Sequence, residues 1–149
     1  MSSINMLENM MIQEIYALVY IEYGMTEYSY SDVVKYQFVF ENLSCCIECD
    51  ESGGGLIYSF DKELVEINME EQGSLAKISL KGHPLYNTTV GEKVKAVKVI
   101  LFENNNVGFS LILEDSKIIL MNLGDEIYFS NNISDELLNE GYTEVDLSL

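Results

Sequence analysis

The chain has 149 residues and a formal net charge of −17, from 25 acidic residues and 8 basic residues that are all lysine. This length suits one domain over residues 1–149, and a hydrophobic content of 48% excludes a disordered acidic chain. A chain without arginine or a basic patch is a poor ligand for nucleic acid, and an anionic membrane would repel it. The charge favours a cationic partner, either a basic protein or a metal cation.

The first element predicted along the chain is a helix over residues 4–23, which Ser3 can cap and Gly24 can end. At 100° per residue, one face of this helix is apolar and rich in methionine. That face comprises Met6, Leu7, Met10, Met11, Ala17, Leu18 and Ile21. Glu14 falls in its middle, where it either pairs with a buried lysine or hydroxyl group or lies at the edge of the face.

After a polar loop at 24–32, the hydrophobic pattern changes to a period of two residues, which is typical of strands. Turns rich in glycine, asparagine and aspartate separate these segments. The predicted strands cover residues 33–41, 45–49, 56–60, 64–69, 75–80, 94–103, 107–113, 117–123 and 127–129. Ser134 can cap a short C-terminal helix over 135–139. The fold class expected is α+β, a mainly antiparallel sheet of about seven to nine short strands with the N-terminal helix packed on it.

Three clustered cysteines, Cys45, Cys46 and Cys49, form a poor framework for disulfides. The segment 4–23 carries three carboxylates, so it is predicted to be neither a signal peptide nor a membrane span. Both observations favour a reduced, cytoplasmic protein.

Cys46 and Cys49 have the Cys-x-x-Cys spacing of half a zinc site, and His83 is the one histidine in the chain. In a strand, however, Cys46 points away from the face that Cys45 and Cys49 share. We therefore expect small buried residues, no cofactor and no enzyme activity, with Cys46, Cys49 and His83 as the residues available to a metal. No nucleophile motif accompanies His83.

The tyrosines point to an interface. Five of the ten lie between positions 16 and 30, in the half of the chain (residues 1–75) that holds 14 acids and 2 lysines. Tyrosine is common at interface hot spots, and acids around it steer a basic partner. The predicted partner-binding residues are Tyr16, Tyr20, Glu22, Tyr23, Glu27, Tyr28, Tyr30 and Asp32. The alternative is that the rest of the fold covers this surface.

Two segments near the C-terminus, residues 108–113 (Gly-Phe-Ser-Leu-Ile-Leu) and 122–128 (Asn-Leu-Gly-Asp-Glu-Ile-Tyr), resemble the hairpins of small bacterial β-rich proteins, some of which accompany toxins. As a small acidic chain rich in tyrosine, the whole sequence resembles the bacterial immunity proteins. That resemblance is one of type and transfers no functional residue. It implies a protein that binds and neutralises a basic toxin, such as a nuclease.

The leading hypothesis is therefore a binding module that blocks a basic protein partner by electrostatic steering and tyrosine-anchored occlusion. Two alternatives stay open. One is an enzyme or small-ligand binder that uses carboxylates, with or without a divalent metal. The other is a structural or regulatory subunit that buries its tyrosines in a homodimer.

Overall fold

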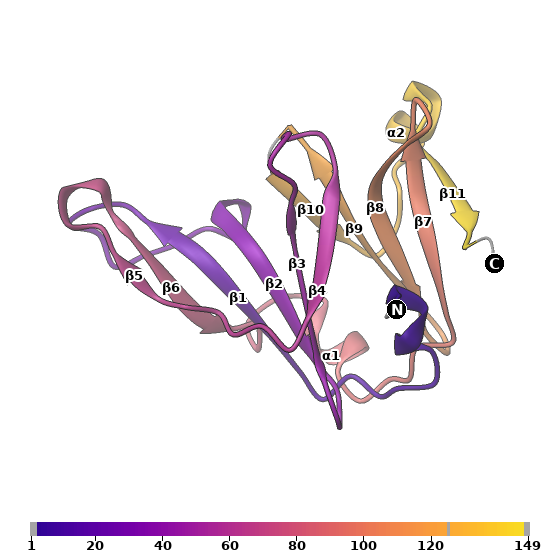
Figure 1. Cartoon of the computed structure of the whole chain (residues 1–149), viewed down its shortest axis with the longest axis horizontal. Coiled ribbons are helices and arrows are strands. Elements are labelled where there is room, and N and C mark those ends of the chain that lie inside the picture. Colours follow the sequence, from indigo (N-terminus) through magenta and orange to yellow (C-terminus); the bar gives the residue numbers. More distant parts are fainter. Residues whose placement is uncertain (1–2, 125, 148–149) are drawn as a thin grey trace.

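The structure, a computed structural model, describes residues 3–124 and 126–147. Within that part, eleven strands form two antiparallel sheets, one from each half of the chain (Figure 1). The N-terminal sheet has the strand order β4-β3-β2-β1-β6-β5, and the C-terminal sheet has the order β10-β9-β8-β7-β11. The strands are β1 (Glu14–Ile21), β2 (Val33–Val39), β3 (Ser44–Cys49), β4 (Leu56–Phe60), β5 (Ile67–Asn68), β6 (Ser74–Ser79), β7 (Ala96–Phe102), β8 (Asn105–Ile112), β9 (Lys117–Leu123), β10 (Glu126–Ser130) and β11 (Thr143–Asp146).

One hydrophobic core joins the two halves. It contains the inward side chains of both sheets, so that Ile15, Ala17 and Val19 of β1 share a cluster with Phe109 and Leu111 of β8. Aromatic rings from the two sheets also pack against each other. Phe129 of β10 meets Tyr36 edge-on at 4.9 Å between ring centroids, and it meets Phe38 in the same way at 6.2 Å. The predicted antiparallel character is therefore confirmed, in two packed sheets instead of one.

The predicted N-terminal helix is wrong. Residues Ile4–Leu7 form one 3₁₀ turn, and Glu14–Ile21 form β1, a central strand paired with β2 and β6. Of the seven side chains assigned to one helix face, only Ala17, Leu18 and Ile21 lie in β1, and there Leu18 is on the opposite face from the other two. Met6 and Met11, which precede the strand, are exposed. The physical reason is that both faces of β1 are largely buried, and an apolar run of this kind fits a period of two as well as 3.6.

The other strand predictions are confirmed in outline. β5 is limited to Ile67–Asn68, and β11 was not predicted. The turn between β7 and β8 is formed by Glu103 and Asn104, both at positive φ (53° and 67°), as a two-residue hairpin turn requires. The described helices are α1 (Tyr86–Thr89) and α2 (Asp135–Glu140), and the hydroxyl group of Ser134 accepts the N–H of Leu137 as predicted for a cap. None of them is long and apolar enough to cross a membrane.

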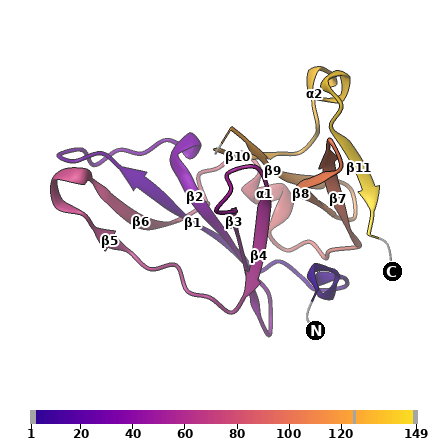
Figure 2. The ribbon, with the colours of Figure 1, turned by 45° about the horizontal axis from the view of Figure 1, so that its top comes forward.

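The outer faces of the two sheets differ in how they are covered. The segment around α2 covers the C-terminal sheet with Ile133, Leu137 and Tyr142. Leu64, in the connection from β4 to β5, packs on Leu18 and Cys46 of the N-terminal sheet. The far end of that sheet, with β5, β6 and the end of β1, projects away from the C-terminal sheet in both ribbon views (Figure 2). We call this part the wing.

Candidate functional site

Residues 20–32, which carry most of the predicted partner-binding side chains, form a hollow of about 370 Å³ at the wing. Its lining comes from the end of β1 and from the loop that leads to β2. The lining residues are Tyr20, Glu22, Met25, Glu27, Tyr28, Ser29 and Asp32. The structure thus brings together five of the eight residues predicted to bind a partner, and it adds Met25 and Ser29, which the sequence reasoning missed.

Tyr20 is held in place from the β5–β6 side. Its hydroxyl group donates to the backbone carbonyl of Gln72 at 3.0 Å, and its ring lies against Gly73. A Cβ atom on Gly73, whose φ is 92°, would come within 2.6 Å of the Tyr20 hydroxyl oxygen, so glycine is required there. Gln72 ends the 3₁₀ turn Glu70–Gln72, which carries two further carboxylates next to the hollow.

The lining of the hollow is acidic and aromatic. Three carboxylates line it together with two phenol rings and a thioether, and the sequence has no lysine between positions 21 and 34. Lys35, the next cation along the chain, lies 3.3 Å from Glu48 on the outer face of the sheet. Aromatic faces and carboxylates together suit an ammonium or guanidinium group. The described lining has no imidazole or thiol group that would serve as a catalytic base or nucleophile.

The three remaining predicted residues lie outside the lining. Tyr16 is on the same face of β1 as Tyr20, but the ammonium group of Lys77 already lies 4.4 Å from its ring centroid. Tyr30 faces the core, where its ring meets His83 edge-on at 4.6 Å, and burial together with the neighbouring Tyr28 raises its pKa. Tyr23 is 63% exposed, just beyond β1. Tyr23 and Tyr28 are therefore the tyrosines most open to a partner.

The residues available to a metal do not assemble into a site. Cys49 packs with Cys45 on the core side of β3, whereas Cys46 lies on the outer face and its thiol donates to the carbonyl of Lys62 at 3.2 Å. Burial and the neighbouring Cys46 raise the pKa of Cys45 to about 12. Within the described residues, no group of three or more histidine, cysteine or acidic side chains is placed to hold a metal ion.

His83 has a structural environment. Its ring stacks on Phe129 at 4.9 Å with 19° between the planes, and Nδ1 accepts the backbone N–H of Leu85 at 3.1 Å. Burial lowers its pKa. These contacts describe a neutral imidazole that packs the connection between the sheets.

Glu14 lies in β1 and not on a helix. Its Oε1 atom accepts the backbone N–H of Ile15 at 3.1 Å. The proximity of the Glu14 carboxylate is the main reason why the pKa of Tyr86 is raised.

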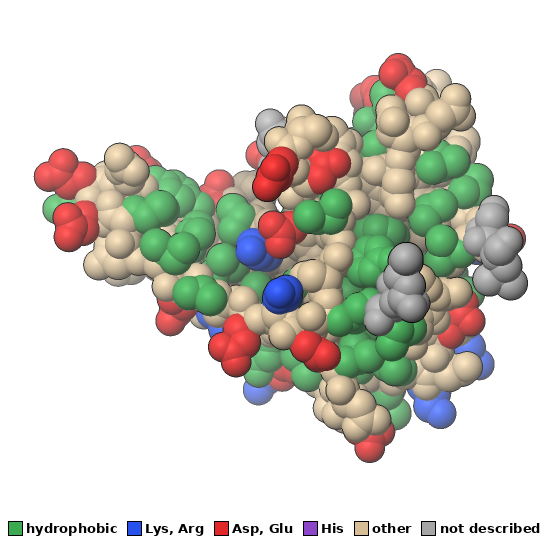
Figure 3. Space-filling model, viewed as in Figure 1, with side chains coloured by type: hydrophobic (Ala, Val, Ile, Leu, Met, Phe, Trp, Pro, Cys, Tyr) green, Lys and Arg blue, Asp and Glu red, His purple; other side chains and the backbone are tan. Residues whose placement is uncertain are grey.

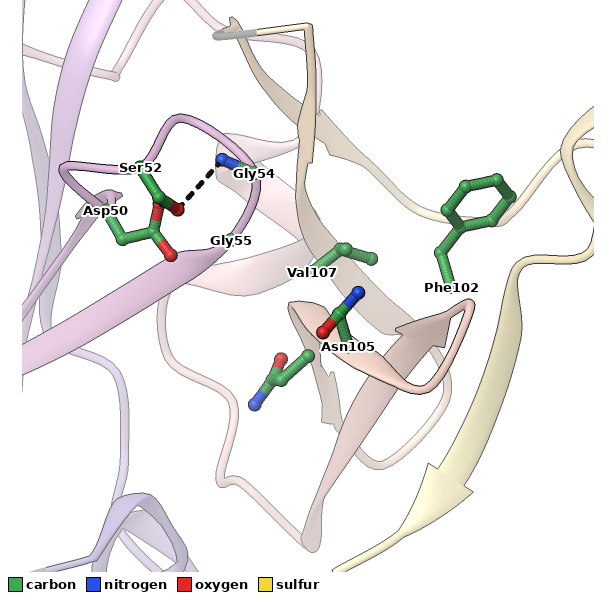
Figure 4. Close-up of a pocket in the computed structure, with 8 residues that line it drawn as sticks. Asp50, Ser52, Gly54, Gly55, Phe102, Asn105 and Val107 are labelled. Carbon is green, nitrogen blue, oxygen red and sulfur yellow. Dashed lines mark hydrogen bonds between the residues drawn. The ribbon is translucent and has the colours of Figure 1, made fainter.

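A cavity of about 530 Å³ lies elsewhere, between the glycine-rich turn that joins β3 to β4 and the β7–β8 hairpin (Figure 4). Asp50 is the one ionisable side chain among its described lining residues. It accepts the Ser52 hydroxyl group at 2.7 Å, and that bond, with backbone N–H groups of the turn, lowers its pKa. The Gly54 N–H donates to the Ser52 oxygen. These polar groups bond to one another within the turn and not to the cavity. We therefore regard the cavity as a gap between the turn and the hairpin and not as a binding site.

No family model, no curated protein and no solved structure matches this chain. Its function is therefore argued from the geometry described above.

Proposed function

We propose that this protein is a binding module that masks a basic protein partner, in the manner of a bacterial immunity protein that occludes its toxin. The observation that carries the proposal is the hollow at the wing, where Tyr20, Tyr28 and Met25 are combined with Glu22, Glu27 and Asp32. It offers hydrogen-bond acceptors, ring faces and apolar surface in one concave place, which is what a lysine or arginine side chain at the centre of an interface requires.

The charge of the molecule supports the same proposal at longer range. A net charge of −17 draws a basic partner toward the protein, and the acidic loop then selects the orientation in which the partner meets the hollow. Association of this kind is fast at low ionic strength and slows steeply as salt is added.

The proposal predicts that a neighbouring gene encodes a basic protein, and the experiment measures binding to that protein by calorimetry at two salt concentrations. The test variant combines Glu22→Gln, Glu27→Gln and Asp32→Asn, which keep the size of each side chain. We expect its affinity to fall at least about tenfold at low salt, because three charges at the contact are lost.

A matched control removes three charges from the C-terminal half of the chain, with Asp115→Asn, Glu126→Gln and Glu140→Gln, which are all exposed. We expect the control to lose less than about threefold, since only long-range attraction changes. Equal losses in the two variants would mean that the hollow is not the contact. A basic neighbour that binds neither the native protein nor its variants would overturn the proposal.

A further inference from the structure

The wing also carries a row of apolar side chains beside the hollow. Tyr20 of β1 pairs with Leu75 of β6, and Leu75 pairs with Ile67 of β5. Directly paired residues in antiparallel strands point to the same face, so these three side chains form one line across the sheet. Leu18 and Leu75 belong to one outer cluster, which places the line on the outer face, away from the main core.

This row is open to solvent at its outer end. Ile67 is 46% exposed and Val65, two residues earlier, is 62% exposed, while Tyr20 and Leu75 are half-buried. A second hollow, of about 440 Å³, is lined by Ile67 and Leu75 and adjoins the row that Tyr20 begins. Figure 3 shows hydrophobic side chains gathered over the wing and acidic ones at its tip. Exposed apolar surface with a polar rim is typical of interaction sites.

The rim around the row is acidic on both sides. Glu22, Glu27 and Asp32 line the hollow at one end. At the other end, Glu66 lines the second hollow beside Ile67, and residues 63–76 contain no lysine. Lys77, which pairs with Leu18, has its ammonium group over the ring of Tyr16, and the Glu66 carboxylate accepts its backbone N–H at 3.1 Å. Charge complementarity therefore selects a cationic occupant, and the apolar row selects one with apolar side chains between its charges.

We infer that the partner surface reaches across the wing from the tyrosine hollow to β5, and that the segment bound there alternates lysine or arginine with large apolar side chains. This inference rests on the proposed function and adds to it the row Tyr20, Leu75 and Ile67. The basic side chains meet the acidic rim, and an apolar side chain between them covers Leu75 and Ile67.

The test uses two short peptides of equal charge with blocked ends, Lys-Leu-Lys-Leu-Lys and Lys-Ser-Lys-Ser-Lys, titrated into isotopically labelled protein while methyl and amide NMR signals are recorded. We expect the leucine peptide to bind about tenfold more tightly, since burial of its apolar side chains adds to the charge attraction. It should shift the methyl signals of Ile67 and Leu75 and leave the methyl signals of Ile57 unmoved.

The chain offers a matched pair of variants, because Ile57 on β4 is also 46% exposed but lies at the opposite edge of the same sheet. Ile67→Ser should abolish the preference for the leucine peptide, and Ile57→Ser should preserve it. The methyl shifts of the native protein test the same contact should a variant fail to fold.

The remaining outcomes separate the two proposals. Equal binding of both peptides, with shifts confined to residues 22–32, would overturn the apolar row and leave the cation-binding hollow in place. A leucine preference that is the same in both isoleucine variants would also overturn the row. Failure of both peptides to bind at low salt would overturn the proposed function itself.

Discussion

At the scale of single residues, Asn122 shows how one polar side chain joins the two sheets. It lies on β9, is 4% exposed, and its amide donates to the carbonyls of Gly53 and Gly55 at 2.8 and 2.9 Å. Gly53–Gly55 is one of the glycine-rich turns predicted between strands, and it does join β3 to β4. The sequence gives no local sign that this turn is bonded to a strand about 70 residues away. An asparagine in a strand looks the same in the sequence whether or not its amide binds a distant turn.

Replacement of Asn122 by alanine should lower the free energy of unfolding by about 2 kcal/mol, because two carbonyl groups lose a buried donor. Urea denaturation of the native and variant proteins measures the difference. The control is Asn105→Ala, which removes an exposed amide bonded to Glu103 at 3.4 Å and should cost less than about 0.5 kcal/mol. Equal losses of unfolding free energy in the two variants would show that the hydrogen bonds from Asn122 to the turn add no stability beyond that of an exposed amide.

The candidate site itself was partly accessible to residue-level reasoning. Tyr20, Glu22, Glu27, Tyr28 and Asp32 lie within 13 consecutive positions, so a short loop brings them together whether a helix or a strand precedes it. The row Tyr20, Leu75 and Ile67 depends on the pairing of three strands, and its members are far apart in sequence. Strand pairing of this kind is set by the whole sheet and cannot be taken from spacing along the chain.

At the scale of elements, two of the errors of sequence reasoning, at β1 and at β11, have opposite causes. β1 was taken for a helix because both of its faces are apolar, which removes the alternation that marks a half-buried strand. β11 was missed because Thr143–Asp146 is short and half polar, at the edge of the C-terminal sheet. β4 and β9, in contrast, were placed to the residue, because turn residues mark their bounds in the sequence: the triple glycine before β4, and Asp115-Ser116 before β9.

Glu144 fastens β11 to its sheet. Its carboxylate accepts the hydroxyl group of the buried Ser110 at 2.6 Å and lies 3.0 Å from the ammonium group of Lys117, and Lys98 is 3.8 Å away. Burial opposes the charge of the carboxylate, but these partners outweigh that effect and lower the pKa of Glu144. A carboxyl group whose pKa is lower in the folded state stabilises the fold above its unfolded pKa. That contribution is lost as the pH falls through the lower, folded value.

Glu144→Gln should therefore cost about 1 kcal/mol of unfolding free energy at neutral pH, a value kept small because both lysines are about one third exposed. The cost should shrink as the pH falls below the usual range of glutamate, since native Glu144 then also becomes neutral. Urea denaturation of both proteins across this range measures the difference, in which the titration of the other acids cancels. A cost that stays constant with pH would show that the ion pairs contribute nothing.

At the scale of the whole molecule, the half of the chain that carries most of the negative charge is also the half that forms most of one sheet. Residues 1–75, which form most of the N-terminal sheet, carry 14 acids and 2 lysines. Within the part of the chain that the structure describes, ion pairs use one of these two lysines, Lys35. The other three lysines in ion pairs lie on the C-terminal sheet or immediately before it. The acids of the wing thus repel one another across a surface that offers few internal cations. Such an arrangement weakens the folded state, which a binding role would explain and solubility alone would not require.

This repulsion predicts that the folded protein gains stability from salt. Between about 0.02 M and about 0.3 M sodium chloride, the Debye length falls from roughly 20 Å to roughly 6 Å, and the unfolding free energy should rise by about 1 kcal/mol. The variant with Glu22→Gln, Glu27→Gln and Asp32→Asn should be at least as stable as the native protein at low salt and should gain less from added salt, since the repulsion in its wing is already reduced. Sucrose in place of salt, which strengthens burial without screening charge, serves as the control for general solvent effects and should act equally on both proteins. If the triple variant were less stable than the native protein at low salt, the three carboxylates would belong to the architecture of the loop. If it were more stable and bound a basic partner more weakly, the same three carboxylates would weaken the fold and strengthen the contact, which is the pattern expected of residues that serve recognition.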